Sequence, residues 1–335
     1  MRFTSALGGE AADGLTVPES LPVIAPKTLS ELDFAERCEA VLRAFFGEVT
    51  GVRDAVRRDY DEEQVPIVKL DDDLYALELW HGKTCYARDL IKTVGTVLNP
   101  DGEVDNTAMY SVAAQVAYWF SAYCDLADSG EIEYGDKIDV ALPIECDGGL
   151  VAAWYAKEMG LPICKIVCAD GKSRALCDFI DTGTFAVGAE ADADLRIVPE
   201  LERIMFSIDN KADIAARMRE LKDAGMFSVS DAEAIRFRGA VACEYVESEA
   251  ADEAIEYAFD EYGYLIDPAT ALAFAAESER DRVRVTLVAA VAHPYTSPKE
   301  VLYALGENPK GTYEDMLNAL EELSAVEIPD ALKKD

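Results

Sequence analysis

Residues 137–169 read KIDVALPIECDGGLVAAWYAKEMGLPICKIVCA and give the clearest indication of the fold. Its two ends, residues 137–143 and 162–169, are short and mostly apolar, as in strands buried on both faces of a sheet. The segment between them, residues 149–160, has the length and composition of a helix and is bounded by glycines. Strand, helix and strand in this order predict a βαβ unit with parallel strands.

The same alternation continues on both sides of this unit. Residues 107–127 are apolar on nearly every face, which predicts a helix buried against the sheet. Residues 282–292 read as a further strand, and residues 67–80 as an antiparallel hairpin about the polar turn DDD. We therefore predict an α/β fold with a mostly parallel sheet and helices on both faces.

Further helices are predicted from the spacing of apolar residues. The segment 30–47 opens on Ser30, with Asp33 three residues later, and reads as a capped amphipathic helix. The other predicted helices lie at residues 88–97, 196–206, 211–225, 230–239, 249–263, 268–279, 298–306 and 312–323.

One turn-rich segment is the best candidate for a linker. It is LNPDGEVDN, residues 98–106, where Pro, Gly, Asp and Asn cluster. We therefore expect an N-terminal helix and hairpin region at residues 1–100 and a large α/β domain at residues 101–335.

The charge balance excludes several classes of partner. The chain has 31 Lys and Arg against 65 Asp and Glu, a formal net charge of −34. Nucleic acid and anionic membrane surfaces would be repelled, so neither is expected as a partner. The acidic runs read as solvated helix faces and turns, with a salt-rich habitat as the alternative. Without a basic-then-apolar leader or an apolar run of about 18 residues, we expect a cytoplasmic protein.

Cysteine and histidine usage gives little sign of a metal site. The eight cysteines contain no CxxC pair, and a chain of this length does not depend on disulfides, so we expect most of them to be small core residues. The two histidines, His81 and His293, are too few for a histidine-rich metal centre.

Several motifs together resemble one enzyme family. ELWHGKTCYARD at residues 78–89 is similar to a Glu-Leu-Phe-His-Gly-Pro-Thr motif that runs into a Phe-Lys-Asp step. Residues 114–131 look like a long buried helix, residues 139–169 like a strand, glycine loop, helix and strand, and residues 262–274 and 291–294 like C-terminal landmarks. In this order the motifs resemble threonine synthase, a pyridoxal-phosphate enzyme of fold type II, and the resemblance implies that family's large domain.

The first departure from the family concerns the amine. In threonine synthases the lysine before the Asp of this motif forms the Schiff base with the cofactor, and the aligned residue here is Arg88. A guanidinium stays protonated and its lone pairs are delocalised, so it cannot condense with an aldehyde. Lys83 and Lys92 lie elsewhere on the turn and helix, and neither is expected to replace it. We predict no catalytic residue at this position.

The second departure concerns the cofactor phosphate. The family's Gly-Asn-Phe-Gly loop, which holds the phosphate at a helix start, aligns with Glu145, Cys146, Asp147 and Gly148. A carboxylate about 4 Å from one unit of phosphate charge opposes binding by roughly 4 kcal/mol at an effective dielectric near 20. A helix cap is the plainer role for Asp147.

The third departure removes polar contacts to the cofactor and substrate. The family's Thr beside the pyridine nitrogen aligns with Val291, which has no donor. A polar triplet of the family is replaced by residues 169–171, Ala-Asp-Gly, and an Asp-Pro-His-Thr step by residues 267–270, Asp-Pro-Ala-Thr. We therefore expect no bound pyridoxal 5'-phosphate.

The fourth departure is a missing lobe. Between Arg88 and the helix predicted at residue 107 there are some twenty residues, where the family has a mobile lobe of roughly a hundred. Apolar surface that once faced the lobe would be uncovered, so we expect a homo-oligomer or heteromer through the face around residues 86–110.

Three functions follow from the resemblance and its departures. The first is a catalytically inactive pseudoenzyme that acts as a binding or oligomerisation scaffold. The second is a working pyridoxal-phosphate carbon–oxygen lyase that makes threonine from O-phosphohomoserine. The third is different chemistry, or carboxylate binding, in a remodelled cleft formed by His81, Arg88, Glu145, Cys146, Asp147 and His293. For Arg88 the plainer expectation is a salt bridge to Asp89, Glu145 or another neighbour.

Overall fold

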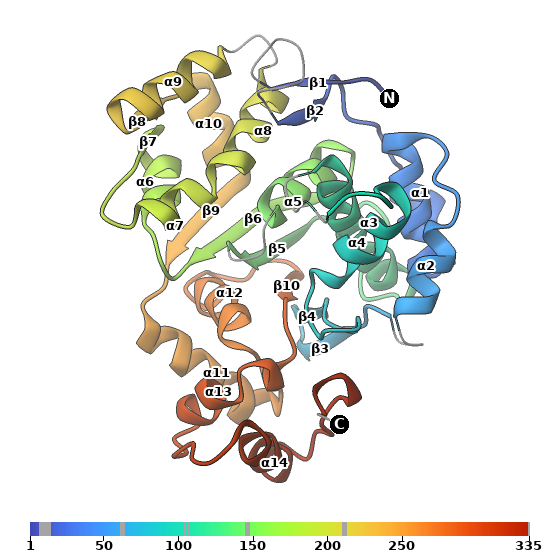
Figure 1. Cartoon of the computed structure of the whole chain (residues 1–335), viewed down its shortest axis with the longest axis vertical. Coiled ribbons are helices and arrows are strands. Elements are labelled where there is room, and N and C mark those ends of the chain that lie inside the picture. The colour runs from blue at the N-terminus through green and yellow to red at the C-terminus, as the bar shows by residue number, and fades with distance from the viewer. Residues whose placement is uncertain are drawn as a thin grey trace.

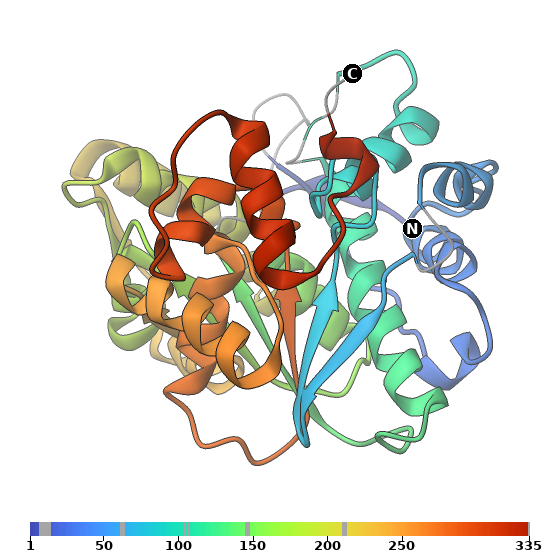
Figure 2. The same ribbon diagram turned by 90° about the horizontal axis from the view of Figure 1, so that it is seen from below.

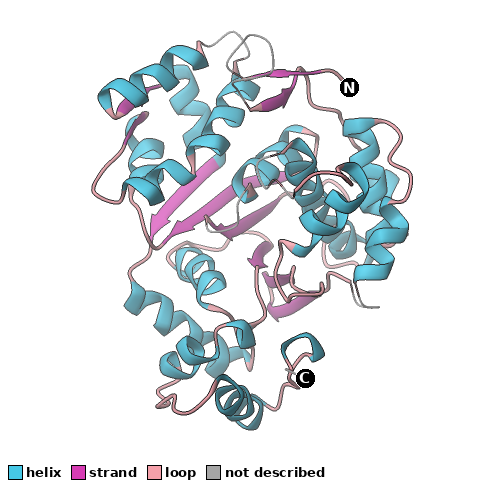
Figure 3. Cartoon of the chain, in the orientation of Figure 1, coloured by secondary structure: helices cyan, strands magenta, loops and turns pink. Residues whose placement is uncertain are grey.

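A six-stranded sheet forms the centre of the protein. The computed structural model describes residues 1–6, 15–60, 64–103, 105, 108–144, 148–209 and 213–333. The sheet has the order β3-β4-β10-β5-β6-β9, and every neighbouring pair is parallel except the hairpin β3–β4 (Figure 1, Figure 3). Its strands are β3 Ile67–Asp71, β4 Leu74–Glu78, β5 Ile138–Pro143, β6 Ile163–Asp170, β9 Val241–Tyr245 and β10 Thr286–Ala290. The predicted fold class is confirmed.

Side chains at alternate positions along the strands pack in two separate hydrophobic cores. In β5, Val140 and Leu142 belong to the larger core, while Ala141 between them belongs to the smaller one. In β10, Leu287 and Val288 divide in the same way. Because both faces of the strands are covered, the strands are apolar at successive positions.

Helices cover both faces of the sheet, and the sequence predicted most of the long ones. The larger core holds α1 Phe34–Phe46, α3 Asp89–Leu98, α4 Met109–Asp128, α5 Gly149–Glu158, α8 Val198–Ile208, α9 Ile214–Ala224 and α10 Asp231–Ala240. The smaller core holds α11 Ser248–Tyr262, α12 Pro268–Ser278, α13 Pro298–Ala304 and α14 Tyr313–Ser324. Figure 1 shows α5 on one side of the sheet and α12 on the other.

The predicted start of the first long helix was wrong. A 3-10 helix, η1, occupies Pro26–Leu29, and α1 begins only at Phe34. The residues that cap it are Asp33, which accepts from the Glu36 amide, and Glu36, whose side chain accepts from the Asp33 amide. This reciprocal capping box fixes the start of the helix four residues after Ser30.

Short elements were not predicted. They comprise β9 in the central sheet, the strand pairs β1 Phe3–Ser5 with β2 Thr16–Pro18 and β7 Thr184–Ala186 with β8 Met226–Ser228, the helices α2 Val52–Asp59, α6 Ala175–Thr182 and α7 Ala191–Arg196, and the 3-10 helices η2 Pro294–Thr296 and η3 Asp330–Leu332. Elements of three to eight residues contain too few periods for hydrophobic spacing to identify them.

The N-terminal hairpin belongs to the same sheet as the strands that follow residue 101. β4 pairs in parallel with β10, from Thr286 opposite Leu74 to Ala290 opposite Glu78. Figure 2 shows the pale blue hairpin beside the orange-red β10. The last strand of the chain thus lies between β4 and β5, which brings the ends of distant segments together.

The cysteines include one pair that the sequence did not indicate. Cys177 in α6 and Cys243 in β9 form a disulfide across 66 residues of sequence. Of the free cysteines in the described ranges, four are buried and Cys164 is half-buried, as expected for small core residues. Among the described residues, no group of three His, Cys, Asp or Glu side chains could hold a metal ion. No helix in these ranges is both long and apolar enough to cross a bilayer.

Candidate functional site

A cavity of about 200 Å³ lies beyond the carboxyl ends of β4 and β10. Three segments line it: residues 86–88 after β4, residues 267–269 at the start of α12, and residues 291–292 with 296–297 after β10. Ligands of open α/β sheets bind at such strand ends, where connections leave for opposite faces. Here the chain leaves β4 for α3, which packs in the larger core, and leaves β10 for α13, which packs in the smaller core.

Backbone contacts hold the segment after β4 against the end of β10. The Ala87 amide donates to the carbonyl of Val291 (2.8 Å), and the His293 amide donates to the carbonyl of Cys85 (3.0 Å). Tyr86 and Ala292 form an isolated antiparallel bridge between these contacts. The structure therefore brings Arg88 and Val291, which the sequence assigned to one site, to the same cavity.

A buried carboxylate organises the turn before Arg88. Asp89 accepts from the amide and the hydroxyl of Thr84, both at 2.6 Å. A Cβ at Gly82 would lie 2.4 Å from the Asp89 Cβ, so only glycine fits beside this carboxylate. The Gly and Asp of the motif are thus needed for the shape of the turn, whether or not the turn serves catalysis.

Arg88 is exposed and lies at the start of α3. Its guanidinium carbon is 5.9 Å from the centre of the Tyr86 ring. The expected salt bridge to Asp89 is not formed, because the carboxylate of Asp89 is engaged by Thr84 and lies 3.5 Å from the Lys92 ammonium. In the parts of the chain that the structure describes, Arg88 has no ion pair. Glu145, the other expected partner, lies outside the described residues.

The two neighbouring lysines point to other partners. The ammonium of Lys83 is 2.5 Å from Asp59 at the end of α2, and its side chain is 62% exposed. Lys92 reaches back to Asp89 from the first turn of α3. Among the described residues that line the cavity there is no lysine.

The start of α12 closes another side of the cavity. Asp267 is the N-cap and accepts from the amides of Ala269 (2.9 Å) and Thr270 (3.3 Å), and from the Thr270 hydroxyl. The Thr270 oxygen in turn accepts from the Val291 amide (3.0 Å). Burial raises the pKa of Asp267 to about 6, and its hydrogen bonds oppose that rise. These contacts join α12 to the end of β10.

The helix start that would hold a phosphate in the family is already engaged. Gly148, in a left-handed conformation with φ of 82°, is the N-cap of α5. It has no side chain that could accept from the first amides of the helix. Instead Glu200 of α8 accepts from the amides of Gly148 (3.3 Å) and Val151 (2.9 Å). Glu200 is 5% exposed. Asp147 lies outside the described residues, so the cap expected from it stays a prediction.

Sequence reasoning missed Glu200 for a physical reason. It lies 52 residues from Gly148, and one more glutamate in the first turn of an amphipathic helix looks like an ordinary helix-start residue. Only the packing of α8 against α5 reveals its partner.

The two histidines come together behind the cavity and do not line it. Trp80 stacks on His81, with ring centres 4.1 Å apart, and meets His293 edge-on at 4.6 Å. His81 contacts Glu78 (2.7 Å), which also accepts from Tyr264 (2.8 Å). The structure therefore does not bring the predicted cleft residues together at one place. Arg88 lines the cavity, whereas the histidines belong to a buried cluster. Glu145, Cys146 and Asp147 lie outside the described residues.

His293 is held neutral in this cluster. Its Nδ1 accepts from the Tyr295 amide (3.1 Å), and the side chain is almost fully buried. Burial, with a smaller contribution from His81, lowers its pKa to about 3. An imidazole of this kind is not available as a proton donor near neutral pH.

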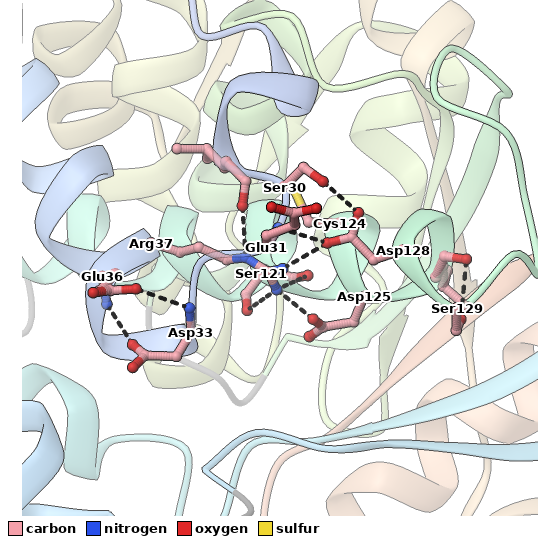
Figure 4. Close-up of polar contacts among 12 residues, drawn as sticks. Ser30, Glu31, Asp33, Glu36, Arg37, Ser121, Cys124, Asp125, Asp128 and Ser129 are labelled. Atoms are coloured by element: carbon pink, nitrogen blue, oxygen red, sulfur yellow. Dashed lines mark hydrogen bonds and ion pairs between the residues drawn. The ribbon is translucent and has the colours of Figure 1, made fainter.

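A larger cavity elsewhere is a weaker candidate site. It measures about 520 Å³ and lies beside Arg37 of α1 and Asp125 of α4. Figure 4 shows Arg37 surrounded by acceptors: it donates to the Ser121 carbonyl (3.1 Å) and to Asp128 (3.1 Å), and also to Asp125. Because the guanidinium of Arg37 is paired with two carboxylates within the protein, we interpret the cluster as a contact that fixes α1 to α4.

Comparison with known proteins gives one consistent family. Human and Macaca fascicularis proteins named threonine synthase-like 1 are each 29% identical over 201 residues, which covers 57% of this chain and 27% of theirs. A threonine synthase of Methylobacillus glycogenes is 28% identical over 260 residues, 70% of this chain and 52% of that protein. The chain spans about a third or less of the length of the threonine synthase-like 1 proteins. No family model matches it.

Solved structures agree on the fold. A Brucella melitensis threonine synthase, described as bound to PLP, superimposes with a TM-score of 0.78 at 20% identity and covers 95% of both chains. The yeast threonine synthase gives the same TM-score at 18% identity and covers 97% of this chain and 94% of that one. The chain is thus similar to threonine synthases in sequence and has their fold.

Proposed function

We propose that this threonine synthase-like chain is a catalytically silent relative of those enzymes that serves as a binding scaffold and carries no pyridoxal phosphate. Two requirements of that cofactor can be tested against the residues of the cleft. It needs a neutral amine within bonding distance of its aldehyde, and it needs donors for its phosphate. The described residues of the cleft fit neither requirement.

The observation that carries the proposal is the contact between Glu200 and α5. The Gly148 and Val151 amides, which belong to the helix start that aligns with the phosphate loop, already donate to a buried carboxylate. A phosphate dianion would have to displace this carboxylate or lie next to it. At about 4 Å and an effective dielectric near 20, each pair of unit charges opposes binding by roughly 4 kcal/mol. The carboxylate therefore takes the place of the phosphate.

The amine requirement supports the same proposal. Arg88 faces the cavity from the position of the family's lysine, and its guanidinium cannot form a Schiff base. Lys83 and Lys92 are held by Asp59 and Asp89. A working threonine synthase would need one of them to leave its partner and reach into the cavity, so we favour the silent scaffold over the active lyase.

Visible absorbance tests the proposal. The purified chain is mixed with excess pyridoxal phosphate, passed through a desalting column, and compared with a threonine synthase treated in the same way. We expect the enzyme to retain the absorbance of a Schiff base and this chain to retain none. Retention of one equivalent of the cofactor by this chain would refute the proposal.

A further inference from the structure

The cavity at the strand ends is lined by a cation, Arg88, that forms no ion pair with any residue in the described ranges. Other arginines bind carboxylates: Arg217 donates to Glu233 at 2.7 Å through both terminal nitrogens, and Arg284 donates to Asp139 at 2.7 Å. Arg88 forms no such pair with any described residue, although the chain has 65 acidic residues. Its donors are therefore available to a ligand in the cavity that it lines.

The rest of the cavity defines what such a ligand must be. The side chains of Ala87, Pro268, Ala269 and Val291 are apolar and favour a hydrocarbon body. Ser297 lines the same cavity, and its hydroxyl has no hydrogen-bond partner in the described parts of the chain. A volume of about 200 Å³ equals the space of roughly seven liquid waters, which limits the ligand to a small molecule.

The neighbouring carboxylate does not provide a site for an ammonium group. Asp267 is 3% exposed, and its oxygens accept from the α12 amides and from Thr270. An amino acid would leave its ammonium group without a counter-ion in the described part of the cavity, which disfavours it. A carboxylic acid without an amino group meets no such penalty.

From this geometry we infer that the cavity binds a small aliphatic monocarboxylate, whose two oxygens pair with the Arg88 guanidinium while its carbon chain lies against Val291 and Ala269. The planar fork of an arginine matches a carboxylate through two parallel hydrogen bonds. The stacking of Arg88 near Tyr86 restrains the guanidinium at the mouth of the cavity. The inference rests on the proposed function, because a chain that held pyridoxal phosphate would fill this cavity with the cofactor.

Titration calorimetry on the full chain tests the inference. The probes are butyrate, the uncharged butyramide of nearly the same shape, and 2-aminobutyrate. We expect butyrate to bind and the other two to bind at least about tenfold more weakly, because an ionic hydrogen-bonded pair is lost or an unpaired ammonium is added. Equal binding of butyrate and butyramide, or no binding of butyrate, would overturn the inference.

Three variants locate the binding site. Arg88→Gln should weaken butyrate binding at least about tenfold, and Arg88→Lys should weaken it less, because a point charge replaces the planar fork. Arg219→Gln makes the same change of charge on the exposed face of α9 and should leave the affinity unchanged. An affinity that is the same in Arg88→Gln as in the native chain would overturn the inference, even if butyrate binds.

The pyridoxal-phosphate experiment separates the two claims. A chain that retains neither the cofactor nor butyrate contradicts only the carboxylate site. A chain that retains the cofactor contradicts the proposed function itself.

Discussion

At the scale of single residues, His293 shows how burial sets chemistry. The family motif around it suggested a place in the cleft, but the imidazole packs against Trp80 and accepts from the Tyr295 amide. The sequence could place His293 in a motif but could not give its burial, which depends on contacts from segments 200 residues away. Arg88, in contrast, lines the cavity, and the inability of its guanidinium to form a Schiff base does not depend on its surroundings.

The depressed pKa of His293 predicts a loss of stability in acid. The native imidazole has a pKa of about 3 against 6.5 when unfolded, so the unfolded chain binds more protons and stability falls as the pH drops below 6.5. Between pH 7 and pH 5 this group should remove about 2 kcal/mol. Asparagine at this position can still accept from the Tyr295 amide without titrating, so His293→Asn should lose less stability over that range.

Urea unfolding of the native chain and His293→Asn at the two pH values measures this difference. Asp267, with its pKa raised to about 6, titrates in the opposite direction in both proteins, so it cancels in the comparison. If the native chain and His293→Asn differ in unfolding free energy by the same amount at pH 7 and at pH 5, then His293 does not cause the loss of stability in acid.

At the scale of elements, the sequence was most accurate where an element is long and both its ends are signalled. The βαβ unit β5-α5-β6 and the terminal helices agree with the structure to within about two residues. The start of α1 was misplaced because Ser30 and Asp33 both match a capping signal, and only the Asp33–Glu36 pair is closed on both sides. Contacts between elements, such as α8 with α5, have no local signal at all.

The contact between α8 and α5 can be tested through Glu200. Glu200→Ala leaves the amides of Gly148 and Val151 buried without an acceptor, which should lower the free energy of unfolding by roughly 1–3 kcal/mol. Glu200→Gln is the matched control, because its carbonyl oxygen still accepts from one of them. It should therefore lose less stability than Glu200→Ala in urea unfolding.

Inorganic phosphate extends this test. The helix start opened by Glu200→Ala should bind an anion, so phosphate should raise the melting temperature of that variant more than it raises that of the native chain. Equal shifts in both proteins would mean that Glu200 does not occupy an anion site.

At the scale of the whole molecule, the disulfide is a long-range restraint. Cys177 and Cys243 close a loop of 66 residues that includes α6 to α10, and a link of this length should stabilise the fold by about 4 kcal/mol in the chain-entropy account. Cys177→Ser should therefore unfold at lower urea concentration than the native chain when no reductant is present.

The half-buried free Cys164 supplies the control for this prediction. Cys164→Ser should behave as the native chain does, and a reductant should bring the native chain to the stability of Cys177→Ser. If a reductant does not change the urea concentration at which the native chain unfolds, the disulfide does not stabilise the fold.

Assembly of the chain remains a prediction. Leu98 and Tyr110, from the segment where the family's lobe would insert, line a groove of about 450 Å³ with Phe46. Among the described residues, none of the exposed large hydrophobic side chains lies at residues 86–110. We expect light scattering to give a mass above the 36.6 kDa of one chain, and Leu98→Asp to reduce it. A native chain that is strictly monomeric would contradict this expectation.

None of the described lysines is placed to hold pyridoxal phosphate in this cleft, and reduction with borohydride measures whether any lysine does so. The chain is incubated with the cofactor, reduced so that any Schiff base becomes permanent, and mapped by peptide mass spectrometry. We predict no stoichiometric label, and in particular none on Lys83 or Lys92. One equivalent of label on a single lysine would show that the chain holds the cofactor as a Schiff base.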